Sequence, residues 1–205
     1  PHPVSFDQDL VEAFARLEKL GHYAHLPMQS GSNRILKSMN RPYSIERFQN
    51  IVKSLRTICP KIRLSTDIIV GYPGETEEDF SLTKEAFETA GFEMGFIFKY
   101  SERAGTPATI YPDKVPQEVK EQRNQELLSL LEKQSLASNL KLVGNKMEIL
   151  VESAARKGNG DFLGRTKCFR KVLFPGYQDL VGKLIEVDIK EANAGGLRAT
   201  PDSLL

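Results

Sequence analysis

Several residue types that define common protein classes are scarce in this chain of 205 residues. It contains no tryptophan and only two cysteines, Cys59 and Cys168. These stand far apart and form neither a CxxC nor a CxxxCxxC motif, which excludes a disulfide framework and a self-sufficient metal or iron–sulfur site. We therefore expect no metal ligand in this chain, and a reducing compartment, the cytoplasm, as its location.

An excess of charge of one sign is also lacking, because 28 Lys and Arg residues balance 27 Asp and Glu residues. No global field indicates a nucleic-acid-binding protein, although a local basic patch remains compatible with this balance. The apolar runs are too short for a membrane span. The start of the chain has neither the basic region nor the apolar stretch of a signal peptide, and it lacks an initiator Met. We expect a chain cut from a longer protein, with no membrane partner.

Helical and strand patterns alternate in the first half of the chain. Ser5 and Gln8 predict a capping box for a helix that ends at Gly21. Strands are expected at 23–28, 62–70 and 92–100, and helices at 30–39, 44–58 and 76–91. This alternation predicts a parallel sheet or barrel whose strands end on one side. Three strands are too few to close a barrel, so we expect the fold to begin before the first residue.

The second half of the chain has a different pattern of expected helices and strands. A charged helix is expected at 116–140, followed by short strands at 147–151, 167–174 and 184–189 that are separated by glycine-rich turns. This spacing predicts a small antiparallel β-barrel. We therefore place one domain at 1–141, including the linker helix, and a second at 142–205.

Polar residues gather where the strands of the first half end. Asp67 lies inside an apolar strand, so its carboxylate needs donors, either protein groups or the hydroxyls of a bound ribose. The turn at 71–76 suits a flat adenine ring, but any βα turn favours Gly and Pro. Gln29 either contributes to a ligand site or only closes its strand. Arg41 either binds a carboxylate bidentately or is a solvated surface residue.

Two histidines, His22 and His25, have the spacing of residues on one strand face. Without a third ligand or a carboxylate close by in the sequence, they are poor evidence for a metal. We expect no metal ligand and no catalytic residue among them.

Basic residues concentrate in one short segment that contains a single acid, Asp161. The segment holds Arg156, Lys157, Arg165, Lys167, Arg170 and Lys171, with Phe162, Phe169 and Phe174 interleaved. Basic side chains bind phosphates and aromatic rings stack on exposed bases, which is typical of small RNA-binding barrels. Aromatic residues that alternate in strands are also common core residues. We expect this segment to bind RNA.

Several stretches together resemble the methylthiotransferases of the radical-SAM superfamily. They are HLPMQSGS at 25–32, MNR at 39–41, STDIIVGYPGET at 65–76 and FKYS at 98–101, followed by Arg103 and GTPA at 105–108. The second half, with GRT at 164–166 and VLF at 172–174, is similar to a TRAM domain. The segments around 165 and 170–174 resemble the MiaB-like branch.

The resemblance implies an α/β fold, the C-terminal half of a radical-SAM partial (βα) barrel followed by an OB-like antiparallel TRAM barrel. It also implies part of a SAM-dependent enzyme that adds a methylthio group to C2 of isopentenyladenosine next to the tRNA anticodon. By similarity, Gln29 and Asp67 hold the ribose of SAM and Arg41 holds its carboxylate. By similarity, Val70 and Gly71 bind the edge of the adenine ring of SAM. The substrate side would be lined by Lys99, Tyr100 and Arg103.

The family uses two 4Fe-4S clusters held by cysteines that this chain lacks, so the isolated chain is expected to be inactive. Two other functions remain open: an RNA-binding module alone, or a sibling methylthiotransferase that acts on a ribosomal protein. The partners expected are SAM and tRNA. Unpaired strand edges of a half barrel also predict non-native self-association.

Overall fold

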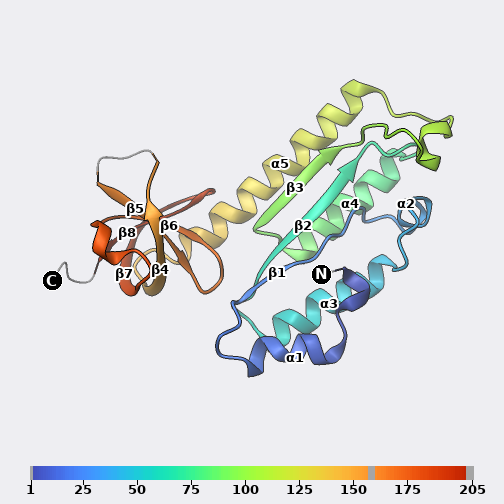
Figure 1. Ribbon diagram of the computed structural model, residues 1–205. Coiled ribbons are helices and arrows are strands. Elements are labelled where there is room, and N and C mark those ends of the chain that lie inside the picture. Colours follow the sequence, from blue (N-terminus) through green and yellow to red (C-terminus); the bar gives the residue numbers. More distant parts are fainter. Residues whose placement is uncertain (1, 157–159, 202–205) are drawn as a thin grey trace. The chain divides into compact units, whose positions relative to one another are not determined.

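The computed structural model describes residues 2–156 and 160–201. Contacts divide the chain into two compact units, which Figure 1 draws with their helices and strands. The first contains Pro1–Leu20 and Ala24–Leu131, and the second contains Gly21–Tyr23 and Glu132–Leu205. This division falls inside a long helix, earlier than the predicted boundary between 141 and 142. Independent folding from residue 142 therefore stays a prediction.

The first unit is built on a three-stranded sheet in the order β1-β2-β3. Its strands are β1 (Tyr23–His25), β2 (Arg63–Val70) and β3 (Met94–Lys99). β2 pairs with β3 in parallel, and an isolated parallel bridge joins Gln29 to Ile68. The helices α1 (Gln8–Arg16), α2 (Asn33–Ser38), α3 (Ile45–Ile58) and α4 (Glu77–Ala90) alternate with these strands. The expected α/β architecture with a parallel sheet is confirmed.

Local capping determines where most of these helices begin and end. Ser32, Ser44 and Thr76 accept hydrogen bonds from amides of the first turns of α2, α3 and α4, and Gly91 ends α4 in the left-handed region with φ 64°. The prediction for the first helix was wrong in its limits. Asp7 is its cap, accepting from the Leu10 amide at 2.9 Å, and the helix ends at Arg16. The residues before it, Pro3–Ser5, form a short 3₁₀ helix, η1.

The core of the first unit lies between β2 and the helices that cover one face of the sheet. Alternate β2 residues, Leu64, Ile68 and Val70, are fully buried. They belong to one cluster with large side chains of α3 and α4, namely Phe48, Leu55, Phe80 and Phe87. Because strand side chains alternate between faces, the intervening residues of β2 point to the opposite face.

The long helix α5 (Gln117–Leu140) contributes to both units. In the first unit, Leu127 is fully buried in the core cluster. In the second, Ser135 and Asn139 donate side-chain hydrogen bonds at 2.7 Å to the carbonyls of Ala194 and Asn193. No helix in the described part of the chain is both long and apolar enough to cross a membrane.

The second unit is a closed barrel in the order β4-β5-β6-β8-β7. Its strands are β4 (Lys146–Ala154), β5 (Asp161–Thr166), β6 (Lys171–Pro175), β7 (Leu184–Asn193) and β8 (Gly196–Pro201). Neighbouring strands are antiparallel except β6 and β8, which are parallel. The barrel core includes Ile149, Val151, Val172, Phe174 and Val187, all buried.

The predicted strand at 167–174 was wrong in its first part. Thr166 and Phe169 form a turn closed by a 2.8 Å backbone hydrogen bond, and Phe169 adopts a left-handed φ of 64°. β5 ends before this turn and β6 begins after it. Two more short 3₁₀ helices, η2 (Pro107–Ile110) and η3 (Gln178–Leu180), lie in connecting segments.

Candidate cofactor site

Gln29 and Asp67 lie side by side where β1 and β2 approach their ends. The Gln29 amide donates to the Asp67 carbonyl at 2.8 Å, and the Ile69 amide donates to the Gln29 carbonyl at 3.0 Å. Gln29 is buried and has φ 66°, a left-handed conformation that is unfavourable for a residue with a side chain. Such strain concentrates at functional sites, where the surrounding structure holds it in place.

The Asp67 carboxylate has a protein partner that the sequence did not predict. His25 Nε2 lies 3.3 Å from Asp67 Oδ2, and His25 Nδ1 lies 2.8 Å from the Ser65 hydroxyl. A neutral ring that donates from Nε2 to Asp67 accepts from Ser65 at Nδ1, so one tautomer satisfies both contacts. The Asp67 side chain keeps 28% of its surface exposed. The histidine therefore orients a carboxylate that stays accessible to a ligand.

Arg41 offers a buried donor in the segment that follows α2. Its Nε is buried and has no hydrogen-bond partner among the described residues. The neighbouring Tyr43 hydroxyl donates to the carbonyls of Pro27 at 3.1 Å and Met28 at 3.3 Å, which ties this segment to the one that carries Gln29. Burial raises the pKa of Tyr43 to about 12, against the opposing charge of Arg41. An unpaired guanidinium nitrogen fits an anionic group such as a carboxylate.

In the turn after β2, backbone amide and carbonyl groups are already hydrogen-bonded within the protein. The Gly71 amide donates to Glu75 Oε2 at 2.6 Å, and the Val70 carbonyl accepts from the Tyr100 amide at 2.8 Å. Gly71 has φ 72°, and a Cβ there would collide with the side chain of Lys120. The Lys120 side chain therefore fills the space beside the Cα of Gly71. Adenine binding at Val70 and Gly71 would use a remaining carbonyl lone pair and not the Gly71 amide.

A buried ion pair fixes this turn against α5. Glu75 and Arg123 keep only 1% and 6% of their side-chain surfaces exposed, and Arg123 Nη1 lies 2.8 Å from Glu75 Oε2. The same guanidinium contacts Glu77 at 3.1 Å and lies over the Phe80 ring. Burial raises the pKa of Glu75 despite the hydrogen bonds from Gly71 and Arg123 that lower it. The ion pair and the hydrogen bond from Gly71 together hold this turn against α5.

The three residues predicted to line the substrate side have different surroundings. Lys99 forms an ion pair with Glu121 of α5. The Tyr100 hydroxyl is buried with no hydrogen-bond partner in the described segments, and its ring meets Tyr72 edge to face. Arg103 is exposed in the connection after β3. Tyr100 is the one of these that presents an unsatisfied polar atom.

In the second unit, the predicted RNA-binding residues divide into exposed and structural ones. Arg156, Lys167 and Lys171 are exposed. Arg170 is buried and donates to Ser138 at 2.8 Å and to Asn139, so its guanidinium stabilises the end of α5 and is not placed to contact RNA. Lys157 lies outside the described residues.

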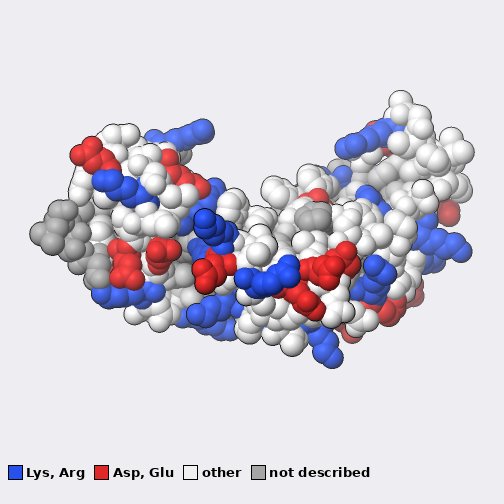
Figure 2. Space-filling view, turned by 60° about the horizontal axis from the view of Figure 1, so that its bottom comes forward, with Lys and Arg blue, Asp and Glu red and all other residues white. Residues whose placement is uncertain are grey.

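The surface around these residues is mixed in charge and includes one exposed ring. Arg165 is paired with Glu152 at 2.7 Å and lies 4.1 Å over the ring of Phe169. Phe169 is exposed, whereas Phe162 and Phe174 are core residues. Figure 2 shows Lys and Arg interspersed with Asp and Glu on the face that it presents. Arg165 thus has an acidic partner and an aromatic neighbour within the predicted RNA-binding segment.

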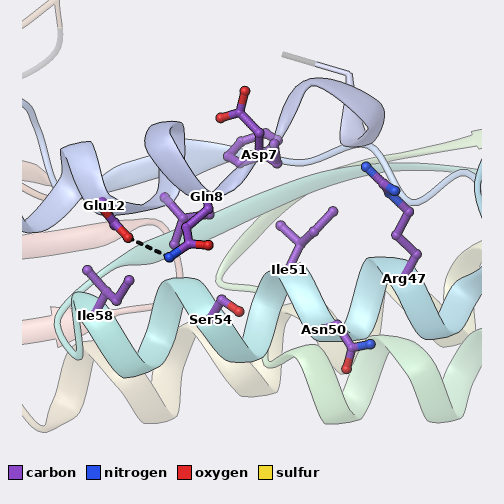
Figure 3. Close-up of a pocket in the computed structure, with 10 residues that line it drawn as sticks. Asp7, Gln8, Glu12, Arg47, Asn50, Ile51, Ser54 and Ile58 are labelled. Carbon is purple, nitrogen blue, oxygen red and sulfur yellow. Dashed lines mark hydrogen bonds between the residues drawn. The ribbon is translucent and has the colours of Figure 1, made fainter.

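A groove of about 540 Å³ lies elsewhere in the first unit, between α1 and α3 (Figure 3). Val11 and Ile51 are among its apolar lining residues, and Arg47 and Asn50 are among the polar ones. Gln8 donates to Glu12 at 2.7 Å at its edge. None of the predicted site residues lines this groove.

The two cysteines do not fit an iron–sulfur cluster. Cys59 is buried in the core of the first unit, and Cys168 lies in the second unit with its Sγ 3.2 Å from Thr166 Oγ1. Within residues 2–156 and 160–201, no three His, Cys, Asp or Glu side chains gather as a metal site.

Comparison with known families identifies both parts of the chain. Residues 2–87 match the model of the Radical SAM superfamily, and residues 140–201 match that of the TRAM domain. The chain is also similar in fold to coproporphyrinogen III oxidase (HemN) from Escherichia coli, described as a radical SAM enzyme. That similarity has a TM-score of 0.53 and 12% identity, and it covers 96% of this chain and 49% of the other.

Curated relatives are similar over nearly the whole chain. A tRNA-2-methylthio-N(6)-dimethylallyladenosine synthase of Opitutus terrae is 50% identical over 197 residues, which are 96% of this chain and 41% of the relative. The protein of the same name from Akkermansia muciniphila is 43% identical over 201 residues, 98% of this chain and 44% of the relative. The chain thus spans less than half the length of these relatives. The chain therefore joins a segment that matches the Radical SAM superfamily model to one that matches the TRAM domain model, and it is similar over nearly its whole length to relatives named as tRNA-2-methylthio-N(6)-dimethylallyladenosine synthases.

Proposed function

We propose that this chain is the SAM-binding and RNA-binding part of a radical SAM tRNA methylthiotransferase. The longer protein would add a methylthio group to C2 of an N6-dimethylallyl adenosine next to the anticodon. The observation that carries this proposal is the 50% identity over 96% of the chain to a relative with that name. The backbone pairing of Gln29 with the strand that carries Asp67, and the buried Arg41 Nε without a partner among the described residues, support it.

In this proposal Gln29 and Asp67 hold the ribose of SAM, and Arg41 and the turn after β2 hold its other groups. The accessible Asp67 carboxylate accepts hydrogen bonds from the ribose hydroxyls of SAM, and His25 keeps it oriented. Arg41 donates from its unpaired Nε to the methionine carboxylate of SAM. The adenine edge would be met by the backbone of Val70 and Gly71, where the Val70 carbonyl keeps one lone pair beyond its hydrogen bond with the Tyr100 amide.

Iron–sulfur chemistry would come from segments of the longer protein outside this chain. A cluster held there would supply the electron for SAM cleavage, and by the resemblance a second cluster would take part in sulfur transfer. The residues of this chain bind and orient SAM and the RNA. We expect the isolated chain to form no deoxyadenosine.

SAM binding by the full-length, cluster-reconstituted protein tests the site. Equilibrium dialysis with labelled SAM should give a dissociation constant raised about tenfold or more in Asp67→Asn and in Arg41→Gln, since each loses a charge-assisted hydrogen bond. The matched controls Asp9→Asn and Arg16→Gln change exposed residues of α1 and should bind SAM normally. Unchanged SAM affinity in both site variants would contradict the site.

The RNA product distinguishes the proposal from its two alternatives. Mass spectrometry of tRNA should detect a methylthio group on prenylated adenosine after incubation with the full-length protein. An RNA-binding module alone would bind tRNA without binding SAM, and a sibling enzyme would modify a ribosomal protein and leave tRNA unchanged.

A further inference from the structure

Two phenylalanines of β3, Phe96 and Phe98, expose about half of their surfaces, 54% and 51%. Their rings lie nearly parallel, with centroids 6.3 Å apart and an interplanar angle of 13°. Single exposed apolar residues are ordinary, but two adjacent aromatic rings on a strand form a surface that favours an apolar contact.

The pair faces away from the helices that cover the sheet. Ile97, which lies between the two phenylalanines in the sequence, packs against the core cluster of the first unit. Its carbonyl accepts a hydrogen bond from the Asn124 side chain of α5 at 2.7 Å. Gly95 faces the same way, because a Cβ on it would lie 3.7 Å from Leu131. Since side chains alternate along a strand, Phe96 and Phe98 point to the opposite face.

That opposite face also carries the candidate cofactor site. In the parallel pairing of β2 with β3, Asp67 is the partner of Phe96 and Ile69 is the partner of Phe98. Partners at the same level of a parallel ladder direct their side chains to the same side. We call this surface the open face; it comprises His25, Ser65, Asp67, Ile69, Phe96 and Phe98.

The open face changes in polarity from one strand to the next. On β1 and β2 it presents His25 and Asp67, with the buried Ser65 hydroxyl beside His25, and on β3 it presents the two rings. A ligand matched to such a face has hydroxyls or other donors at one end and a compact apolar group at the other. A prenylated nucleoside bound next to SAM has this character.

We propose that Phe96 and Phe98 form the contact surface for the dimethylallyl group of the substrate adenosine and thereby select prenylated tRNA. This inference rests on the proposed function and adds the residues that recognise the substrate. The rings supply apolar surface that the five-carbon dimethylallyl group can cover. A plain adenosine would leave this surface exposed to water. An apolar contact of this size should make the affinity for the prenylated RNA about one to two orders of magnitude higher than that for the plain RNA.

The test compares two RNAs on the full-length, reconstituted protein. Fluorescence anisotropy would give dissociation constants for an anticodon stem–loop that carries either dimethylallyl adenosine or plain adenosine. In the double variant Phe96→Ala/Phe98→Ala, the preference for the prenylated RNA should fall about tenfold, while affinity for the plain RNA stays unchanged. The variants Phe96→Leu and Phe98→Leu should keep most of the preference, because they remain apolar.

A control substitution removes an exposed apolar side chain from another surface of the same unit. Leu82 of α4 is 47% exposed, and Leu82→Ala should leave the preference unchanged. If the double variant does not fold, the single variant Phe96→Ala carries the test, because its side chain is the more exposed of the pair.

Two results would overturn the inference. One is an undiminished preference in the alanine variants. The other is an equal loss of affinity for both RNAs together with weaker SAM binding, which would mean that another segment of the longer protein packs on the rings. In either case, SAM affinity that still depends on Asp67 would leave the proposed function intact. A wild-type protein that ignores the prenyl group and binds no SAM would instead refute the proposed function itself.

Discussion

The pKa of Asp79, in the first unit, lies well below its ordinary value. Burial alone would raise its pKa, but hydrogen bonds from Arg34, Ser32 and Thr76 outweigh this effect and lower it to about 2. The Ser32 hydroxyl lies 2.6 Å from Oδ1, and the Thr76 amide lies 2.9 Å from Oδ2. One carboxylate thus caps α4 and also holds the start of α2.

We predict that Asp79→Asn lowers the free energy of unfolding of the first unit by about 2 kcal/mol at neutral pH. Because the folded pKa lies below the ordinary 3.8, the ionised group stabilises the fold above about pH 4. This contribution disappears as the pH falls towards 2. Urea denaturation between pH 7 and pH 3 should show the difference between wild type and variant shrinking. Glu78→Gln, at an exposed position of the same turn, should show little difference at any pH.

Single residues were predictable from the sequence where their partners are close along the chain. The start of α4 was predicted closely, because the contact between its cap, Thr76, and Asp79 spans three positions. The contact between His25 and Asp67 was not predicted, because it depends on how β1 and β2 align. Arg170 was taken for a surface residue because its partners, Ser138 and Asn139, lie on a distant helix.

At the scale of elements, α5 and the turn after β2 depend on each other. The turn is fixed by Glu75, which is buried against Arg123, and by Lys120, whose side chain covers Gly71. Removing one partner of a buried pair leaves an uncompensated charge, which costs about 3–5 kcal/mol.

We therefore predict that Arg123→Leu increases hydrogen exchange at the Gly71 amide and destabilises the first unit by about 3 kcal/mol. The double variant Arg123→Leu/Glu75→Gln should recover part of this loss, because no buried charge remains. Native-state hydrogen exchange by mass spectrometry measures both effects. A double variant as unstable as the sum of the two single ones would contradict a direct coupling.

Helices and strands were predictable to different degrees. The helical repeat of apolar residues predicted α3 and α5 nearly to their observed limits, Ile45–Ile58 and Gln117–Leu140. In the barrel, β5 and β8 were missed because short strands with charged outward residues have a weak pattern. The strand predicted from 167 was too long, since a left-handed Phe169 gives no signal in the sequence.

At the scale of the whole molecule, the second unit carries the expected RNA-binding cations. We predict that the triple substitution of Arg156, Lys167 and Lys171 by Gln weakens tRNA binding by the full-length protein. It should also reduce the slope of log K against log salt concentration by about 0.7–0.9 for each phosphate that the variant no longer neutralises. The same charge change at Arg16, Lys19 and Lys53, exposed residues of the first unit, should have a smaller effect. Equal effects of both triples would contradict RNA binding by this barrel.

The overall fold was predictable because joined motifs of the chain resemble one family. The parallel pairing of β6 with β8 was not predictable, because it depends on which strands, distant in the sequence, become neighbours when the barrel closes. Self-association through the edges of β1 and β3, the outer strands of the sheet, stays a prediction.

The position of β8 in the barrel has a genetic consequence. This last described strand, Gly196–Pro201, is inserted between β6 and β7 and closes the cylinder. A premature stop codon or frameshift just before the codon of Gly196 would remove this strand. It would open the barrel and leave two neighbouring strands without their shared hydrogen-bonding partner. Alleles truncated at this position should therefore behave as loss-of-function alleles.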